Sequence, residues 1–322
     1  MRAIKPFAEI LDINTGVDVL KKIELVGRTC YKSTDKITDD SAPKFVENLV
    51  KSKHEAMLEH ASFCFEIDYG VYRYMYDYIR VLSDNIGFKS FIRFTVEDRI
   101  LMSGNVRAWR DLFQYMKLEI GIPIFFKDFI EENHILFHDC QHKIFFDNLN
   151  VGSIRPVHVE DLRTELEVLT HCDVTVRFVV DRGISHEIVR HRPASFAQES
   201  TRYCNYGKDK FGGQLTFIIP EFFQYKSAEW NIWKSLMENI EHWYLRMIEL
   251  GVTPEKARTV LPNSLKTELI MTANCAEWIH FFELRACNNT GKAHPQILEV
   301  SRPLLDEFKG TIAEIFDDLK YE

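Results

Sequence analysis

The strongest constraint on the fold is the run Val174-Thr-Val-Arg-Phe-Val-Val180, in which β-branched residues dominate and apolar side chains alternate with others. Such a run favours an extended strand over a helix. The next residues, Asp181-Arg-Gly-Ile-Ser185, turn the chain into a short helix with apolar positions at Ile184 and Ile188. Pro193 then closes this helix, because the residue before a proline is disfavoured in the α region. A strand that leads directly into a helix predicts a mixed fold.

Apolar periodicity predicts further elements along the chain. Helical spacing continues from Trp230 to Ile248, roughly six turns, and Gly251 is a credible end for that helix. Thr253 and Pro254 are expected to be the N-cap and first residue of the next helix. The other predicted elements are two helices between Ile10 and Lys51, strands at about 61–67, 91–96 and 215–219, and helices at about 265–285 and 295–319.

The aromatic-rich residues 69–170 are expected to form an insertion of mixed structure. Within them, Val106, Trp109, Arg110 and Phe113 would share one face of a helix. The sequence contains no internal repeat, low-complexity tract or flexible linker. We therefore expect residues 1–322 to form a single elaborated catalytic domain that contains this insertion.

Composition excludes several classes of protein. The 322-residue chain is 46% hydrophobic and 27% charged, the balance of a soluble globular protein, and no run approaches the ~18 apolar residues of a membrane helix. Its net charge of −8 argues against a nucleic-acid polymer as partner and requires any anionic ligand to be held by a local group of basic residues. The seven cysteines include no Cys-x-x-Cys pair. We therefore expect reduced thiols in a cytoplasmic protein without a leader or membrane segment.

The densest group of chemically useful side chains is Arg190-His-Arg-Pro-Ala-Ser-Phe-Ala-Gln-Glu-Ser-Thr-Arg-Tyr203. A guanidinium matches phosphate oxygens bidentately and serine hydroxyls can complete an anion site, so this spacing suits a nucleotide or dinucleotide phosphate. A helix C-terminus alone would account for the first three residues, because positive charge there is favourable by about 0.3–1 kcal/mol in any protein. It does not account for Ser195, Ser200 and Arg202. On chemistry alone, both interpretations stay open.

The same run resembles the signature of the flavin-dependent thymidylate synthases, which is Arg-His-Arg followed after seven residues by Ser. Two upstream segments, Arg28-Thr-Cys-Tyr31 and His54-Glu-Ala-Met-Leu-Glu-His60, resemble that family's elements in order. The downstream matches are Ala257-Arg-Thr-Val-Leu-Pro262, Asn274 and Leu284-Arg285. Several spaced motifs that agree are more specific than any one of them.

The resemblance implies an α+β fold, a small twisted sheet with packed helices, that carries an inserted α/β segment. It also implies methylation of dUMP to dTMP, with methylene-tetrahydrofolate as carbon donor, FAD as hydride carrier and NADPH as reductant. A cytoplasmic homotetramer with active sites shared between subunits is implied as well. The better-known thymidylate synthases use a cysteine in a Pro-Cys context, but none of the ten prolines here precedes a cysteine. The uracil would therefore be activated electrostatically.

The resemblance also implies roles for individual residues. Arg285 would be the catalytic group that stabilises negative charge on the uracil oxygens. Substrate contacts would come from Glu187, Arg190, Gln198, Glu199, Ser200, Arg202 and Arg258, with Ser200, Arg202 and Arg258 at the phosphate and backbone N–H groups near Gln198 and Glu199 assisting. FAD contacts would come from His54, Arg190, His191, Arg192, Asn274 and His280. No metal ligand is expected.

Departures from the family pattern leave alternatives open. Ala197-Gln198 stands where the family usually has Asn-Glu, and Asn288 to Ala293 replaces its C-terminal histidine region. One-carbon or hydroxymethyl transfer to another pyrimidine deoxynucleotide is thus an alternative, as is a nucleotide-binding homologue without turnover.

A zinc site and two common kinds of nucleotide-binding motif are disfavoured. His134, His138 and His142 have a spacing that zinc accepts, but residues spanning about 12 Å on a straight helix cannot all reach one ion. The chain also lacks a Gly-x-Gly-x-x-Gly or phosphate-loop pattern.

Overall fold

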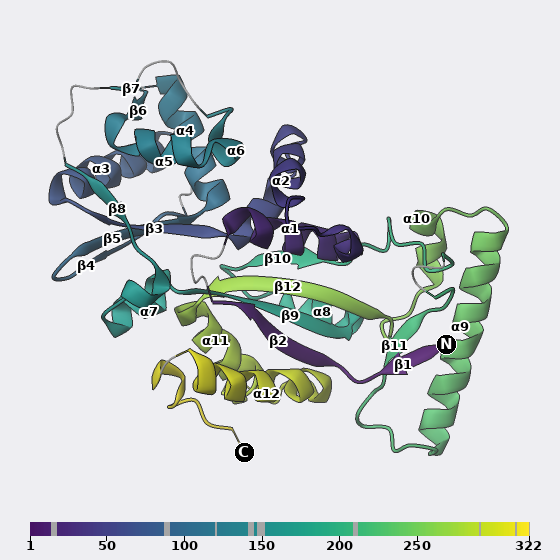
Figure 1. Ribbon diagram of the computed structural model, residues 1–322. Coiled ribbons are helices and arrows are strands. Elements are labelled where there is room, and N and C mark those ends of the chain that lie inside the picture. The colour runs from purple at the N-terminus through teal and green to yellow at the C-terminus, as the bar shows by residue number, and fades with distance from the viewer. Residues whose placement is uncertain are drawn as a thin grey trace. The chain divides into compact units, whose positions relative to one another are not determined.

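The computed structural model describes residues 1–13, 18–86, 91–119, 121–140, 145–146, 152–208, 212–289, 291–312 and 314–321 (Figure 1). The chain divides into two compact units. Unit 1 comprises Met1–Leu11, Gly27–Asp35 and Thr175–Glu322, and unit 2 comprises Asp12–Val26 and Lys36–Val174. Both units contain helices and strands, so the predicted α+β class is confirmed.

Unit 1 is built on a four-stranded sheet with the strand order β10-β12-β9-β2. These strands are β2 (Phe7–Asp12), β9 (Asp173–Asp181), β10 (Ser195–Gln198) and β12 (Lys266–Asn274). β10 and β12 are antiparallel, with Gln198 opposite Leu269. A smaller parallel pair joins β1 (Arg2–Ile4) to β11 (Thr216–Ile218). The predicted strands near 174–180 and 215–219 are thus confirmed.

The helices of unit 1 begin at side-chain caps where the sequence supplies them. Asp181, Ser227 and Asn274 accept the first free backbone N–H groups of α8 (Arg182–Ile188), α9 (Ala228–Glu249) and α11 (Cys275–Arg285). Gly251 follows α9 at φ +84°, as its predicted role as a stop requires. In Figure 1, α11 and α12 (Pro295–Thr311) lie together below the sheet, with the rings of Trp278 and Phe308 5.1 Å apart. The short elements of this unit are α10 (Pro254–Ala257), η6 (Arg258–Val260) and η7 (Glu314–Phe316).

The prediction of one helix over 265–285 is wrong in its first half. Lys266–Asn274 forms strand β12, and only Cys275–Arg285 is helical. β12 is a central strand, and the side chains of Leu269, Ile270 and Met271 are all buried. A strand buried on both faces has a continuous apolar run, which periodicity alone does not distinguish from a buried helix.

Unit 2 contains a second four-stranded sheet, in the antiparallel order β4-β5-β3-β8. Its strands are β3 (Ser62–Ile67), β4 (Arg93–Val96), β5 (Ile100–Asn105) and β8 (Ile154–Pro156). The remaining elements include α1 (Val19–Cys30), whose last residues belong to unit 1, together with η1 (Thr34–Lys36), α2 (Ala42–Lys51), η2 (Glu55–His60), α3 (Tyr69–Ile86), α4 (Val106–Glu119), β6 (Ile122–Pro123), η3 (Ile124–Phe126), α5 (Lys127–Glu132), α6 (His134–Phe137), β7 (Phe145–Phe146), η4 (Val159–Asp161) and α7 (Glu165–His171). The four positions predicted to share one face of α4 are all fully buried, Arg110 among them.

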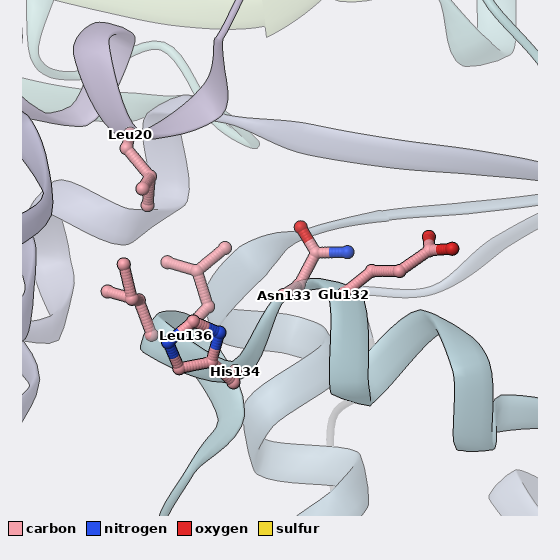
Figure 2. Close-up of a pocket in the computed structure, with 6 residues that line it drawn as sticks. Leu20, Glu132, Asn133, His134 and Leu136 are labelled. Atoms are coloured by element: carbon pink, nitrogen blue, oxygen red, sulfur yellow. The ribbon is translucent and has the colours of Figure 1, made fainter.

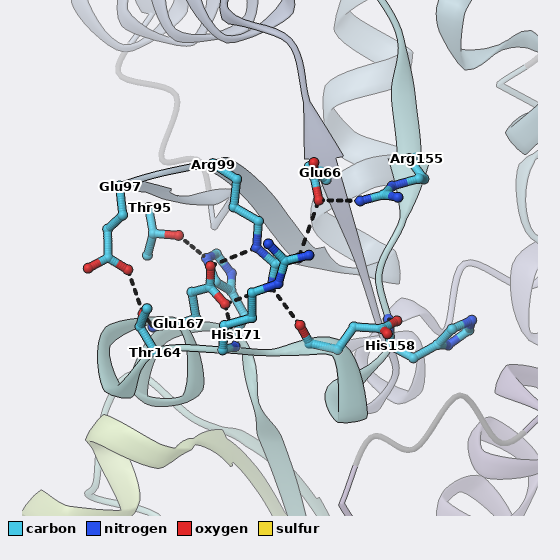
Figure 3. Close-up of polar contacts among 11 residues, drawn as sticks. Glu66, Thr95, Glu97, Arg99, Arg155, His158, Thr164, Glu167 and His171 are labelled. Carbon is cyan, nitrogen blue, oxygen red and sulfur yellow. Dashed lines mark hydrogen bonds and ion pairs between the residues drawn. The ribbon is translucent and has the colours of Figure 1, made fainter.

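Buried polar groups tie α7 to the β4–β5 hairpin (Figure 3). The Arg99 guanidinium donates to both carboxylate oxygens of Glu167 at 2.8 and 2.7 Å, and a further Arg99 nitrogen donates to Glu66 at 3.2 Å. The ring of His171 lies between two hydroxyls, with Nε2 2.9 Å from Thr95 Oγ1 and Nδ1 2.6 Å from Ser103 Oγ. α7 is therefore held by ionic and neutral hydrogen bonds together.

Two general features complete the description. No disulfide joins any of the seven cysteines, all of which lie in the described part of the chain, and six of them are buried. None of the helices in the described part of the chain combines the length and apolar character needed to cross a bilayer.

Candidate functional site

The side chain of Arg285 is held from two directions at the C-terminus of α11. Its Nε donates to His191 Nε2 at 3.0 Å, and its Nη1 donates to Glu187 Oε2 at 3.0 Å. Its Nη2 has no partner among the described residues, and the side chain is 22% exposed. The guanidinium is therefore oriented by the protein and keeps donors for a ligand.

His191 is buried beside this guanidinium. Its ring lies 4.8 Å from that of Phe281 and 6.2 Å from that of His280. Burial, together with the nearby charges of Arg285 and His280, lowers the pKa of His191 to about 4. Near pH 7 the ring is neutral, as it must be for Nε2 to accept a hydrogen bond from Arg285.

Glu187 belongs to α8, and side-chain hydrogen bonds fix both ends of the first turn of this helix. Asp181 Oδ1 accepts the backbone N–H of Ile184 at 2.8 Å, and the amide nitrogen of Gln198 donates to Ser185 Oγ at 2.8 Å. The same amide nitrogen lies 3.2 Å from Thr267 Oγ1. Gln198 thus connects β10 to α8 and β12 within the protein.

Four predicted site arginines are exposed and make no ion pair with any described residue: Arg190, Arg192, Arg202 and Arg258. Arg190 and Arg192 follow the C-terminus of α8, and Arg258 begins η6. The Arg202 guanidinium lies 5.5 Å from the ring centre of Tyr203, whose ring is 5.7 Å from that of Tyr31. Unit 1 therefore carries the local unpaired positive charge that an anionic ligand requires, although the whole chain is acidic.

The turn after β10 holds its serine through backbone contacts. Ser200 N–H donates to the carbonyl of Cys30 at 3.1 Å, and Arg202 N–H approaches Ser200 Oγ at 3.4 Å. Glu199 N–H donates to the carbonyl of Glu268 at 2.8 Å, so it is engaged within the sheet.

Other predicted site residues lie apart from Arg285. Asn274 caps the opposite end of α11, about 16 Å away along the helix axis at 1.5 Å per residue. His280 is exposed between them, near His191. His54 precedes η2 in unit 2. Among the described residues, neither Arg202 nor Arg258 shares a hydrogen-bond or ion-pair partner with Arg285.

The histidines with zinc-like spacing do not form a metal site in the described part of the chain, and His142 lies outside it. α6 ends at Phe137, so His138 follows the helix. A pocket of about 60 Å³ lies next to His134 and is lined also by Leu20, Glu132, Asn133, Ile135 and Leu136. Figure 2 shows these side chains around it. The pocket contains none of the predicted site residues.

The sequence did not predict a cluster of charged side chains, centred on the buried Glu199, directly beside Ser200. Glu199, Lys266, Glu268 and Lys32 contact one another there, and Tyr206 joins them. The useful signal was the spacing of Lys266 and Glu268, since residues two apart share a face of a strand. Expecting a helix over 265–285 concealed this relation.

Comparison with known proteins places these features in a family context. The family described as thymidylate synthase complementing protein matches residues 13–76 and 162–312. A flavin-dependent thymidylate synthase of Geobacter sulfurreducens is 34% identical over 152 residues, 47% of this chain and 62% of that protein. One from Pyrococcus furiosus is 37% identical over 126 residues, 39% of this chain and 50% of that protein. The chain thus spans about half to three fifths of the length of these relatives.

A solved structure also aligns with most of the chain. The UMP/dUMP methylase PolB from Streptomyces cacaoi, bound with 5-Br dUMP, is 14% identical and covers 96% of this chain and 93% of its own, with a TM-score of 0.41.

Proposed function

The chain belongs to the flavin-dependent thymidylate synthase family, and we propose that it converts dUMP to dTMP with methylene-tetrahydrofolate as carbon donor and NADPH as reductant. The observation that carries the proposal is the oriented guanidinium of Arg285, held by Glu187 and His191. The same unit carries four arginines that have no ion pair with any described residue. A cation with fixed direction and free donors suits a substrate that must be polarised.

Arg285 would act on the uracil ring. Carbon 5 of uracil is a weak nucleophile, and negative charge that develops on the ring oxygens during attack needs stabilisation. Glu187 and His191 fix two of the three guanidinium nitrogens, so the third would donate to a uracil oxygen without reorganisation. Because His191 is neutral near pH 7, it orients Arg285 without adding a second positive charge.

Ser200, Arg202 and Arg258 would bind the nucleotide phosphate. Both guanidiniums are exposed and unpaired among the described residues, which leaves their N–H groups free to donate bidentate hydrogen bonds to phosphate oxygens. The Ser200 turn supplies a hydroxyl from the same segment as Arg202.

Arg190, Arg192 and His280 suit the anionic part of FAD, because all three are exposed and the two arginines have no ion pair among the described residues. His54, His191 and Asn274 would complete the flavin contacts. When bound, the flavin would supply the hydride that reduces the transferred carbon to a methyl group.

We further propose that the protein works as a homotetramer with shared sites. Arg285 and Asn274 lie about 16 Å apart at opposite ends of α11, which is expected if neighbouring copies of the chain complete each site.

The visible spectrum of the purified protein tests this function. We expect FAD to bind and give the bands of oxidised flavin, NADPH to bleach them, and methylene-tetrahydrofolate with dUMP to restore them. A protein that cannot be loaded with FAD would contradict the proposal. Reoxidation with another pyrimidine deoxynucleotide, but not with dUMP, would favour the alternative substrate.

A further inference from the structure

Charged side chains form a compact cluster around the buried Glu199, directly before the Ser200 turn, and the other three charged members are partly buried. Glu199 is 2% exposed, and its carboxylate accepts hydrogen bonds from Tyr206 Oη and from Lys266 Nζ, both at 2.9 Å. Lys266 Nζ also donates to Glu268 at 2.6 Å. Lys32 Nζ donates to the same Glu268 oxygen and lies 3.7 Å from Glu199. Two carboxylates and two ammonium groups thus share one site in unit 1.

This cluster joins three separate segments of unit 1. Glu199 follows β10, Lys266 and Glu268 belong to β12, and Lys32 belongs to the segment Gly27–Asp35. Backbone bonds run beside it, from Glu199 N–H to the carbonyl of Glu268 and from Ser200 N–H to that of Cys30. The residue before Ser200 is therefore fixed through its side chain and its backbone.

The carboxylate of Glu268 keeps its charge near neutral pH. Burial alone would raise the pKa of Glu268, but the ammonium groups of Lys266 and Lys32 outweigh it and hold this pKa at about 2. Burial and the carboxylate of Glu199 raise the pKa of Tyr206, which stays a hydrogen-bond donor.

Stability alone gives little reason for such a cluster. Replacing a buried ion network by apolar residues of similar volume is often neutral or stabilising, because desolvation offsets the attraction between the charges. A network in which each group has one satisfied arrangement does, however, define the position of its members. Here that position is transmitted to Ser200 through a single planar peptide unit.

We propose that Glu199 is a positioning residue for the nucleotide phosphate: without touching the ligand, it holds the turn that presents Ser200 and Arg202. This inference rests on the proposed function, because it takes a nucleotide phosphate as the ligand of that turn. Lys266, Lys32 and Tyr206 act through Glu199.

The test compares a nucleotide with its nucleoside. Glu199→Gln keeps the shape of the side chain but removes its charge. We expect the dissociation constant for dUMP to rise about tenfold, as for a lost charge-assisted contact, while that for deoxyuridine and the FAD content stay unchanged. Glu238→Gln, on the exposed face of α9, removes the same charge elsewhere and should change none of these values.

A second variant pair shows whether Glu199 and Lys266 act as a unit. The double variant Glu199→Gln, Lys266→Gln should have a dissociation constant for dUMP no higher than that of the single variant that binds dUMP less tightly. The reason is that both single variants and the double variant lack the same ion pair. Additive losses would overturn the inference.

The possible outcomes separate the two proposals. If the unaltered protein binds neither dUMP nor deoxyuridine, the proposed function fails and this inference fails with it. If the unaltered protein binds dUMP and Glu199→Gln binds it equally well, or weakens both ligands alike, only the positioning role is overturned. If Glu199→Gln does not fold, Tyr206→Phe tests the same role. We expect its affinity for dUMP to fall severalfold while its affinity for deoxyuridine stays unchanged, and an unchanged affinity for dUMP would overturn the positioning role of Glu199.

Discussion

Arg285 illustrates how neighbouring side chains can prepare one cation for catalysis. Its Nε and Nη1 are engaged by His191 and Glu187 at 3.0 Å each, so its direction is set before any ligand binds. A positively charged group that is already oriented stabilises charge in a transition state without paying for reorganisation.

Arg285→Ala should therefore lower turnover more than it weakens binding of dUMP. We expect kcat to fall roughly 100-fold or more, with a much smaller change in the dissociation constant measured by calorimetry. Arg285→Lys is the matched variant, because it keeps the charge but cannot reach both partners with a planar fork. Equal losses in kcat and in binding would show that Arg285 holds the substrate without a specific effect on the reaction.

Arg202→Ala should act on nucleotide binding instead. A charge-assisted phosphate contact contributes about 1.5–3 kcal/mol, so the dissociation constant for dUMP should rise roughly 10- to 100-fold while FAD is retained. Arg246→Ala removes an exposed arginine of α9 and serves as the control. If FAD and dUMP are lost together, the division of the arginines between phosphate and flavin is wrong.

His171 should make unit 2 less stable as the solution becomes acidic. Burial, with the charge of Arg93, lowers the pKa of His171 to about 4, below its value near 6.5 in an unfolded chain. The unfolded state therefore takes up the proton first, and the stabilisation present above pH 6.5 is lost as the pH falls towards 4. Urea unfolding of the unaltered protein and of His171→Gln should show their difference in stability shrinking by about 2–3 kcal/mol over this range. Parallel pH profiles would contradict the assignment.

At the scale of elements, the strand-to-helix junctions position the site. β9 leads into α8 through Asp181, and β12 leads into α11 through Asn274. The helices that follow these two adjacent strands bring Glu187 and Arg285 into contact. The sequence predicted the first junction, because the β-branched run of β9 is followed by a turn and then by apolar positions at helical spacing. It missed the second, since the apolar run of β12 suits either a strand or a helix.

Asp181→Ala should test whether α8 positions Glu187. Asp181 caps α8 and also accepts a hydrogen bond from Gln296 at 2.7 Å, so its loss should lower the free energy of unfolding by about 1–2 kcal/mol and reduce kcat as well. Ser227→Ala removes the comparable cap of α9 and should lower stability alone. A stable Asp181→Ala variant with full activity would show that the cap of α8 is not needed to position Glu187.

At the scale of the whole molecule, motif spacing predicted the family and the α+β class, because these depend on residues spread along the chain. It singled out the arginines in 190–202 and Arg258 as ligand contacts, but it could not give partners that depend on strand register, such as Lys266 for Glu199. The family matches leave residues 77–161 between them, and the insertion expected at 69–170 stays a prediction.

Assembly also stays a prediction, which light scattering tests directly. We expect an assembly of four chains of 37.9 kDa each, and a monomer that is catalytically active would exclude shared sites.

Product analysis tests the central claim most directly. The purified protein should be incubated with FAD, NADPH, methylene-tetrahydrofolate and dUMP, and the nucleotides separated and identified by mass spectrometry. We predict dTMP, formed only when all four compounds are present and not by Arg285→Ala. Unchanged dUMP in the complete mixture, with FAD bound and reduced by NADPH, would contradict the account.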